Sequence, residues 1–243
     1  MKIFNTVLFA IAAFSTSAQT TLVPGKSSFE KKWISNSEYK MKWLGIRDTM
    51  AIEIGEVSTK ILVQNDKLTV ITNVAMKNSA EPWADTTTAH ISTLKPIYHS
   101  SFNRQRNMSI NFGPTVTGYY FDKPKNEKTV ITETPTRDYF DSNIYPVLIG
   151  WLPLTDGFTT NITIFDYAPG GNTGVRDIVV SDVKTSSFLS KKQGLRDVWI
   201  VTVVDGKGEN ASTSIFYFDK QDRTLWKQEI AAGKRNMRMV RVE

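Results

Sequence analysis

The chain has 243 residues, of which 40% are hydrophobic and 22% charged, and its formal net charge is +6. This composition is typical of a globular protein rather than of a disordered, collagen-like or coiled-coil chain. Because the sequence contains no cysteine, it excludes disulfides, a thiolate nucleophile, a cysteine-ligated zinc and a lipid-modified cysteine.

The first 18 residues have the three parts of a secretory signal peptide. Lys2 supplies the positive charge, an apolar stretch runs from Ile3 to Phe14, and small residues end the segment at Ala18. That stretch is too short to span a bilayer, and the sequence has no later apolar run long enough to do so. The alternative for this segment is a buried N-terminal helix. We expect residues 1–18 to be removed, which leaves an exported protein, periplasmic or extracellular, without a transmembrane segment.

Residues 19–243 are expected to form a single domain. They are numerous enough to bury a core, and no linker, low-complexity tract or repeat divides them. The clearest hairpin is predicted around Asn65-Asp66, two residues that tolerate the positive φ of a tight turn. A two-residue turn there places Val63 opposite Leu68, so that the apolar side chains of both strands share one face.

Short strands at regular intervals, separated by turn residues, indicate an antiparallel meander. Besides the hairpin at 60–64 and 67–76, the expected strands cover roughly residues 84–93, 96–103, 106–112, 115–122, 127–133, 159–167, 175–189, 196–205, 212–218, 224–230 and 235–242. In the late strands, around residues 198–204 and 215–218, apolar residues occupy both alternating positions. Both faces of the sheet are therefore expected to be covered there, or one of them to face an apolar cavity.

The segment 138–154 is the best candidate to cover one of these faces. Its apolar residues recur at the spacing of an amphipathic helix: Ile144, Val147, Leu148, Trp151 and Leu152. With Asn143 as N-cap, Pro146 falls in the first turn, where its missing N–H breaks no hydrogen bond, and Pro153 ends the helix. Since this helix is apolar almost all round, we expect it to be buried against the sheet. A second, weaker helix is expected at residues 28–34.

A resemblance to a known family rests on these same residues. The run RDYFDSNIYPVLIGWLPL at 137–154, the strand ITIFD at 162–166 and the hairpin at 214–229 resemble an uncharacterised family of exported bacterial proteins. That family is similar in fold to the periplasmic lipoprotein carriers (LolA/LolB-like). The chain departs from the pattern at Gly150, where a basic residue is usual. The family has no established activity, so the resemblance implies a shape and not a reaction.

The expected fold is mainly β. It is a single curved antiparallel sheet that forms a partly open barrel, with one or two short helices in or over the concave face. The resemblance implies the curvature and the placement of the helix near residues 143–152.

Several chemistries are excluded or disfavoured. The motifs of zinc proteases, α/β-hydrolases and dinucleotide-binding enzymes are absent, as are the signatures of nucleic-acid-binding domains. The two histidines, His90 and His99, are expected to face each other on paired strands. A catalytic zinc needs a third protein ligand, for which only Glu81 or Asp85 is near in sequence. We therefore predict no metal and no cofactor, and interpret the histidines as half-exposed residues of a sheet.

Two interpretations of the charged residues remain open. Glycoside hydrolysis needs two carboxylates on either side of a bond, and Asp138, Asp141, Asp156 and Asp166 are candidates. Such residues more often cap helices and turns. The basic residues are scattered among acidic ones, which is typical of a solvated surface, and they also suit attraction to an anionic surface of the cell envelope.

The leading hypothesis is a non-enzymatic binding protein of the cell envelope. It would hold a lipid, a lipidated partner or another apolar ligand inside the half-barrel, in a hollow that we expect to be lined by Leu148, Trp151, Phe165 and Trp199. The alternatives are an interaction module with a solid core and a hydrolase that acts on envelope glycans or lipids through the aspartates.

Overall fold

The structure is a computed structural model that describes residues 21–26, 29–81, 83–171, 173–208 and 211–243. The predicted signal peptide, residues 1–18, lies outside the described residues. Within them, no helix has both the length and the apolar character needed to cross a membrane.

The described residues form one 16-stranded sheet and two short helical segments. The strands are β1 (Thr21–Leu22), β2 (Ser37–Arg47), β3 (Met50–Gln64), β4 (Lys67–Met76), β5 (Trp83–His90), β6 (Pro96–Phe102), β7 (Arg106–Asn111), β8 (Val116–Asp122), β9 (Glu127–Glu133), β10 (Phe140–Asp141), β11 (Thr160–Asp166), β12 (Gly174–Ser190), β13 (Gly194–Asp205), β14 (Ser212–Asp219), β15 (Leu225–Ala232) and β16 (Arg235–Arg241). The helical segments are the 3₁₀ turn η1 (Lys31–Trp33) and the α-helix α1 (Tyr145–Gly150).

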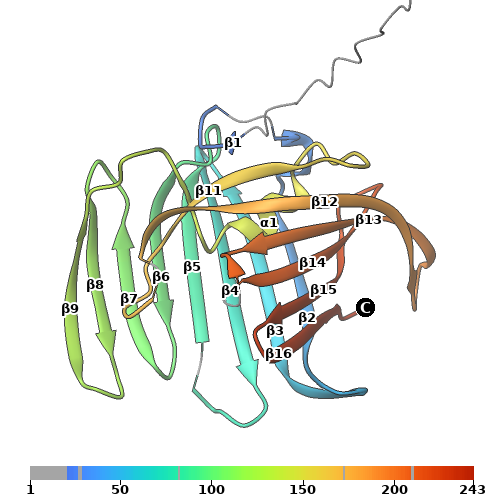
Figure 1. Cartoon of the computed structure of the whole chain (residues 1–243), viewed down its shortest axis with the longest axis horizontal. Helices are drawn as coiled ribbons and strands as arrows, with labels where there is room; N and C mark the ends of the chain where they lie inside the picture. The colour runs from blue at the N-terminus through green and yellow to red at the C-terminus, as the bar shows by residue number, and fades with distance from the viewer. Residues whose placement is uncertain (1–20, 27–28, 82, 172, 209–210) are drawn as a thin grey trace, which may run out of the picture.

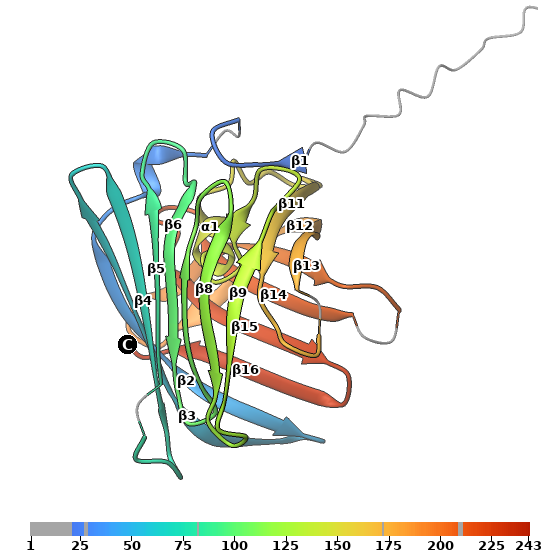
Figure 2. The same ribbon diagram turned by 90° about the vertical axis from the view of Figure 1, so that its left-hand side faces the viewer.

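The sheet is a meander that curls into a partly open barrel. Its strand order is β1-β11-β12-β13-β14-β15-β16-β2-β3-β4-β5-β6-β7-β8-β9, so the C-terminal strand β16 pairs with β2 and joins the two halves. Strands β2–β9 form one wall, strands β12–β16 form the other, and α1 lies between them (Figures 1 and 2). The pairing is antiparallel except at β1 and β10, which both lie parallel to β11. The predicted curved, mainly β fold with an open barrel is confirmed.

The predicted central hairpin has the expected register, with Val63 opposite Leu68 across β3 and β4. Asn65 in its turn has φ +55°, which is the left-handed conformation that asparagine tolerates. Strand β2, Ser37–Arg47, was not predicted. It contains few β-branched residues and carries alternating charges at Lys40 and Lys42, so its sequence lacks the usual strand signals.

Helix α1 is shorter than predicted and begins later. It spans Tyr145–Gly150 rather than 143–152, and its N-cap is Ile144, which makes no side-chain capping bond. The predicted N-cap, Asn143, instead donates its side-chain amide to Thr87 Oγ1 at 3.0 Å. The N-cap prediction was therefore wrong because a tertiary contact with β5 engages that amide. Of the predicted helix at 28–34, residue 28 lies outside the described residues, and residues 29–34 contain only the single 3₁₀ turn η1.

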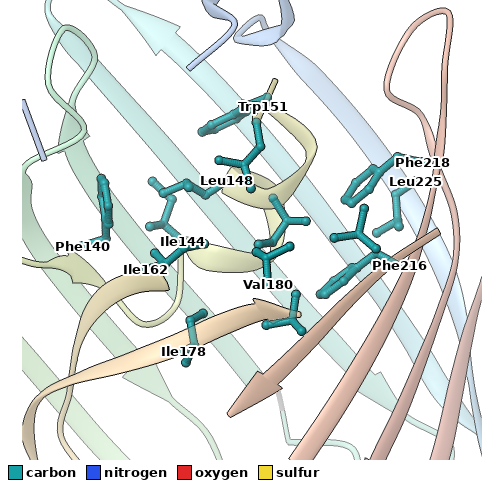
Figure 3. Packing of buried hydrophobic residues seen from close by; sticks show 14 of the residues in the cluster. Phe140, Ile144, Leu148, Trp151, Ile162, Ile178, Val180, Phe216, Phe218 and Leu225 are labelled. Atoms are coloured by element: carbon teal, nitrogen blue, oxygen red, sulfur yellow. The ribbon is translucent and has the colours of Figure 1, made fainter. Parts of the chain in front are cut away.

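The main core lies between the two walls and surrounds α1 (Figure 3). Leu148 and Ile149 of α1 are completely buried, as are Val201 and Phe216, which face each other across β13 and β14. On the opposite face of β13, Val198 is equally buried. The expected coverage of both faces holds only in part: α1 covers one face, whereas the other carries the stacked rings of Phe188 and Trp226, with centroids 5.6 Å apart, but leaves Ile200, Ile215 and Tyr217 half-buried.

A second, smaller core shows that the sheet overlaps itself. Phe165 of β11 packs with Tyr139 and with inward-facing residues of β7–β9, among them Ile110 and Ile131. Its ring centroid lies 5.3 Å from that of Tyr139 and 5.9 Å from that of Phe112. Strand β11 therefore lies between two layers, with Ile162 and Ile164 in the main core and Phe165 in the second.

Candidate ligand-binding site

The structure brings together three of the four side chains expected to line a hollow. Leu148 and Trp151 belong to the main core, and Trp199 packs against the edge of that core. Phe165 lies in the second core, on the other face of β11. Leu148 and Phe165 are at most 1% exposed. The four residues thus do not surround one shared space.

A cavity of about 130 Å³ lies beside α1. Of the four predicted residues, only Trp151 lines it, together with Pro146, Val147 and Gly150 of the helix segment. A pocket that holds a drug-sized ligand has ~300 Å³ or more. The space next to the helix is therefore too small for an acyl chain.

A larger hollow lies away from the helix, at the end of the β2–β9 wall where β4–β5 and β6–β7 turn. It has a volume of about 610 Å³. Its lining combines apolar and aromatic side chains with polar and charged ones: Met76, Asn78, Ser79, Glu81, Trp83, Asn103, Arg104, Gln105, Arg106 and Tyr120. We call this space the β4–β8 hollow.

The strand register places the apolar lining of the β4–β8 hollow on the inner face of the sheet. Tyr120 lies opposite Met108, which belongs to the second core, and Trp83 lies opposite the buried Val74. The ring of Trp83 meets that of Trp43 edge-on, with centroids 6.2 Å apart. The inner face thus continues past both cores into a half-buried aromatic surface.

Sequence reasoning missed this hollow. The available signal was the alternation in β5, where Trp83, Asp85, Thr87 and Ala89 share one face. Because two of these four residues, Asp85 and Thr87, are polar, the strand does not have the apolar pattern by which an inner face is usually recognised.

A third space, of about 520 Å³, lies where the β2–β3 turn meets the β15–β16 turn. Its apolar residues include Ile52 and Met237, and its charged residues include Arg47, Lys234 and Arg235. Since Ile52 is 51% exposed, this space is an open surface depression rather than an enclosed site.

Between the two cores lies a buried polar network centred on Asp141 of β10. His99 Nδ1 lies 3.0 Å from Asp141 Oδ1, and Thr87 donates its hydroxyl to Asp141 Oδ2. Burial opposes the charged form of His99, but the carboxylate of Asp141 outweighs this effect, with a smaller contribution from Asp85, and the pKa of His99 is raised. The network attaches β10 to β5 and β6.

The two histidines do not face each other as expected. His99 lies opposite Thr87, whereas His90 lies opposite Lys67 and is exposed. Histidines at these positions face each other only across a two-residue turn at Leu94 and Lys95, but β5 ends at His90 and β6 begins at Pro96, and Leu94, with φ +59°, donates its N–H to His90 O. Among the described residues, no group of three or more His, Asp or Glu side chains is arranged to hold a metal ion.

Comparison with known proteins places the chain in a family. Residues 38–240 match the family model described as "Protein of unknown function (DUF3108)". The chain belongs to this family. Its fold is also similar to the crystal structure of a beta-barrel-like protein of the domain of unknown function DUF1849 from Brucella abortus. The two chains are 13% identical, the TM-score is 0.52, and the match covers 86% of this chain and 97% of the other. No curated protein matches the chain.

At this identity, the likeness to the Brucella abortus protein shows the fold alone. It agrees with the curved, open sheet described above. Neither its title nor the DUF3108 description names an activity.

The aspartates considered for hydrolysis in this DUF3108 chain all have partners. Asp138 forms an exposed ion pair with Lys26, at 3.6 Å. Asp166 accepts hydrogen bonds from Ser142 and from Arg176, and Asp141 belongs to the buried network. Asp156 accepts hydrogen bonds from the N–H and the hydroxyl of Thr185. Asp141, Asp156 and Asp166 therefore connect neighbouring segments, whereas the exposed pair of Asp138 contributes little to stability.

Proposed function

We propose that this DUF3108 protein is an exported, non-enzymatic binding protein that holds the apolar part of an amphiphilic ligand, such as a lipid, in the β4–β8 hollow. The observation that carries the proposal is the half-buried inner surface formed by Met76, Trp83 and Tyr120 around a space of about 610 Å³. Pockets for small molecules have this size, and the lining here combines these three apolar or aromatic side chains with seven polar or charged ones.

The charges beside the hollow suit an amphiphile with an anionic end. Arg106 donates its Nε–H to Ser101 at 3.0 Å, and Arg104 is exposed at the same turn. An apolar chain on the aromatic wall would leave its head group near these two cations. Methionine adapts to ligands of varied shape because its side chain is flexible and polarisable.

The proposed location in the cell envelope rests on the signal-peptide pattern of residues 1–18. The resemblance to periplasmic lipoprotein carriers suits the same location, and a lipidated protein would present the same kind of apolar chain. The net positive charge of the chain also suits a binding protein that works at an anionic surface of the cell envelope.

The test uses the chain from residue 19 to 243, purified without detergent. Its organic extract is examined by mass spectrometry, and fatty acids are titrated against a bound fluorescent dye. We expect a co-purified amphiphile, and displacement of the dye. Met76→Glu, which places a charge in the hollow, should weaken dye binding by about tenfold or more.

Val130→Glu is the matched control, because Val130 is 73% exposed and lies on β9 opposite Tyr119, on the outer face. It should leave dye binding unchanged. An empty extract with no displacement by fatty acids would rule the proposal out, and so would equal effects of the two variants.

A second candidate, an interaction module with a solid core, is favoured by the dense packing around α1. The space beside the helix is only about 130 Å³, and Leu148, Ile149 and Gly150 are buried. Such a module would purify without a ligand, and Met76→Glu would change neither dye nor fatty-acid binding.

A further inference from the structure

The side chain of Arg223 is buried without enough hydrogen-bond partners. It is 8% exposed, and its Nη2 donates to Glu30 Oε2 at 2.9 Å. Its Nε and Nη1 are buried and have no acceptor. A buried guanidinium with two unsatisfied donors is unfavourable, so an acceptor is expected next to it.

The backbone conformation of Arg223 is energetically unfavourable. Its φ is +60°, a conformation that is uncommon for residues other than glycine, asparagine and aspartate. Its Cζ lies 5.2 Å from the centroid of the Trp33 ring in η1, which fixes the guanidinium between η1 and the β14–β15 turn. The donors are therefore preorganised rather than free to turn toward solvent.

The cavity beside α1 is the candidate place for an acceptor. Arg223 lines this space of about 130 Å³, and so does a second cation, Arg241, whose Cζ lies 5.1 Å from the Tyr39 ring. Exposed Ser35 and Ser37 lie at its rim. The space admits a few water molecules or one small polar group, but no chain.

The nearby carboxylates do not satisfy Arg223, whereas Arg241 donates its Nη1–H to Leu225 O at 3.4 Å. Glu30 is shared among Arg223, Lys32 and the indole N–H of Trp33, at 2.9, 3.1 and 2.7 Å. Burial alone would raise the pKa of Glu30, but these donors lower it to about 2. The negative charge of Glu30 is therefore already shared among three donors. Asp222, the acidic residue lining the cavity, is exposed and accepts the N–H of Thr224.

We propose that this cavity binds one small oxyanion, a carboxylate or a phosphate group, through the guanidinium of Arg223, with Arg241 as the second cation. A planar guanidinium pairs with such groups through two parallel N–H···O bonds, and on its Nε side the paired donors are Nε–H and the second N–H of Nη2, so an oxyanion there would satisfy the Nε of Arg223. The apolar wall formed by Val147, Trp151 and Phe218 excludes bulk water and strengthens the charge interaction.

The site is independent of the β4–β8 hollow. Ile61 of β3 lines the cavity, whereas Gly55 of the same strand lies opposite Met76 of the hollow. Six residues along a strand span roughly 20 Å. Failure of phosphate binding at the cavity would therefore not contradict ligand binding in the β4–β8 hollow, and failure of ligand binding there would not contradict the oxyanion site.

The direct test observes the arginine side chains in the NMR spectrum of ¹⁵N-labelled protein, residues 19–243, while inorganic phosphate replaces chloride at constant ionic strength. We expect the Nε–H signal of Arg223 to shift and saturate. Arg223→Gln should weaken phosphate binding by about tenfold or more, and Arg241→Gln by a smaller factor. Arg223→Lys, which keeps the charge but loses the paired donors, should bind more weakly than the wild type.

Arg235→Gln is the matched control, since it removes the same charge from the exposed β15–β16 turn. It should bind phosphate as the wild type does. If the Arg223 signal does not respond in the unmodified protein, or if Arg235→Gln weakens binding as much as Arg223→Gln, the cavity holds only water and the proposal is wrong. The first criterion needs no variant, so it applies even if Arg223→Gln fails to fold.

Two further titrations distinguish the source of the oxyanion. Acetate tests a free carboxylate, and a lysophosphatidate, with one acyl chain and one phosphate, tests a lipid head group. Displacement of phosphate by the lysophosphatidate at lower concentration than by acetate indicates a head-group site. Saturation by phosphate or acetate without competition from the lipid indicates a site for a free anion.

Discussion

His99 Nδ1 lies 3.0 Å from Asp141 Oδ1, and the two side chains are only 8% and 1% exposed. The contact crosses from β6 to β10, the two-residue strand that precedes α1. Asp85 and Arg106 also act on His99, the first favouring and the second opposing its charged form. The protonation of His99 therefore affects how strongly β10, and with it the segment that carries α1, is attached to β6.

The protein should lose stability as the pH rises above neutrality. Burial opposes the charge on His99, but Asp141 raises the pKa of this group above its ordinary value of 6.5. A pKa raised in the folded state adds stability that is fully present below the unfolded value and disappears as the pH passes the folded value. Urea unfolding at several pH values should show this decline beginning near pH 6.5.

His99→Asn should abolish this decline and lower stability at acid pH, because Asp141 then loses its cationic partner. His90→Asn removes the other histidine, which is exposed at the end of β5, and should leave the decline in place. A wild-type protein with the same stability at pH 6 and pH 9 would show that the pair is not charged in the folded state.

Gly150→Ala should destabilise the protein. A methyl group at this position would stand 2.9 Å from Cε1 of the buried Phe218 ring, closer than real contacts allow. Overpacking of this kind costs about 1–3 kcal/mol, which exceeds the gain of up to about 1 kcal/mol from replacing glycine in a helix. Gly171→Ala is the control, because its nearest contact would be an ordinary 3.5 Å. Equal unfolding midpoints for the two variants would contradict the packing around α1.

Much of the sheet could be predicted from the sequence because period-two alternation and turn chemistry act locally. Asn65 and its neighbour specify the hairpin turn, and the register of Val63 with Leu68 follows from it. Strand β2 was not predicted because its own sequence lacks strand signals, and one of its two neighbours, β16, is distant in sequence.

The interior could be predicted less well, because it depends on how the sheet curls. The apolar pattern of the α1 segment correctly indicated a buried helix, but no local signal shows that β11 lies between two layers. Phe165 therefore falls in a different core from Leu148. The burial of Arg223 could not be predicted either, because it arises from contacts with Glu30 and Trp33, which lie nearly the whole chain away in sequence.

Leu148→Ala should be strongly destabilising. Leu148 is completely buried at the centre of the main core, where the walls on both sides meet α1. Removing such a side chain costs about 2–5 kcal/mol, depending on how far the site can collapse. Leu195→Ala, at a position that is 71% exposed, should change the free energy of unfolding by less than about 0.5 kcal/mol. Similar losses for both variants in urea unfolding would contradict the placement of α1.

Phe165→Ala tests whether the second core holds the overlapping layers together. The ring contacts both Tyr139 and Phe112, and its loss should cost about 3–5 kcal/mol. Because these contacts join β11 to β7–β9, hydrogen exchange should accelerate first in β7–β9, the free edge of the sheet, and less in β13 and β14. Phe102→Ala, at a position that is 39% exposed on the outer face of β6, should leave that exchange pattern unchanged. Uniform acceleration throughout the sheet would show instead that the two cores unfold as one unit.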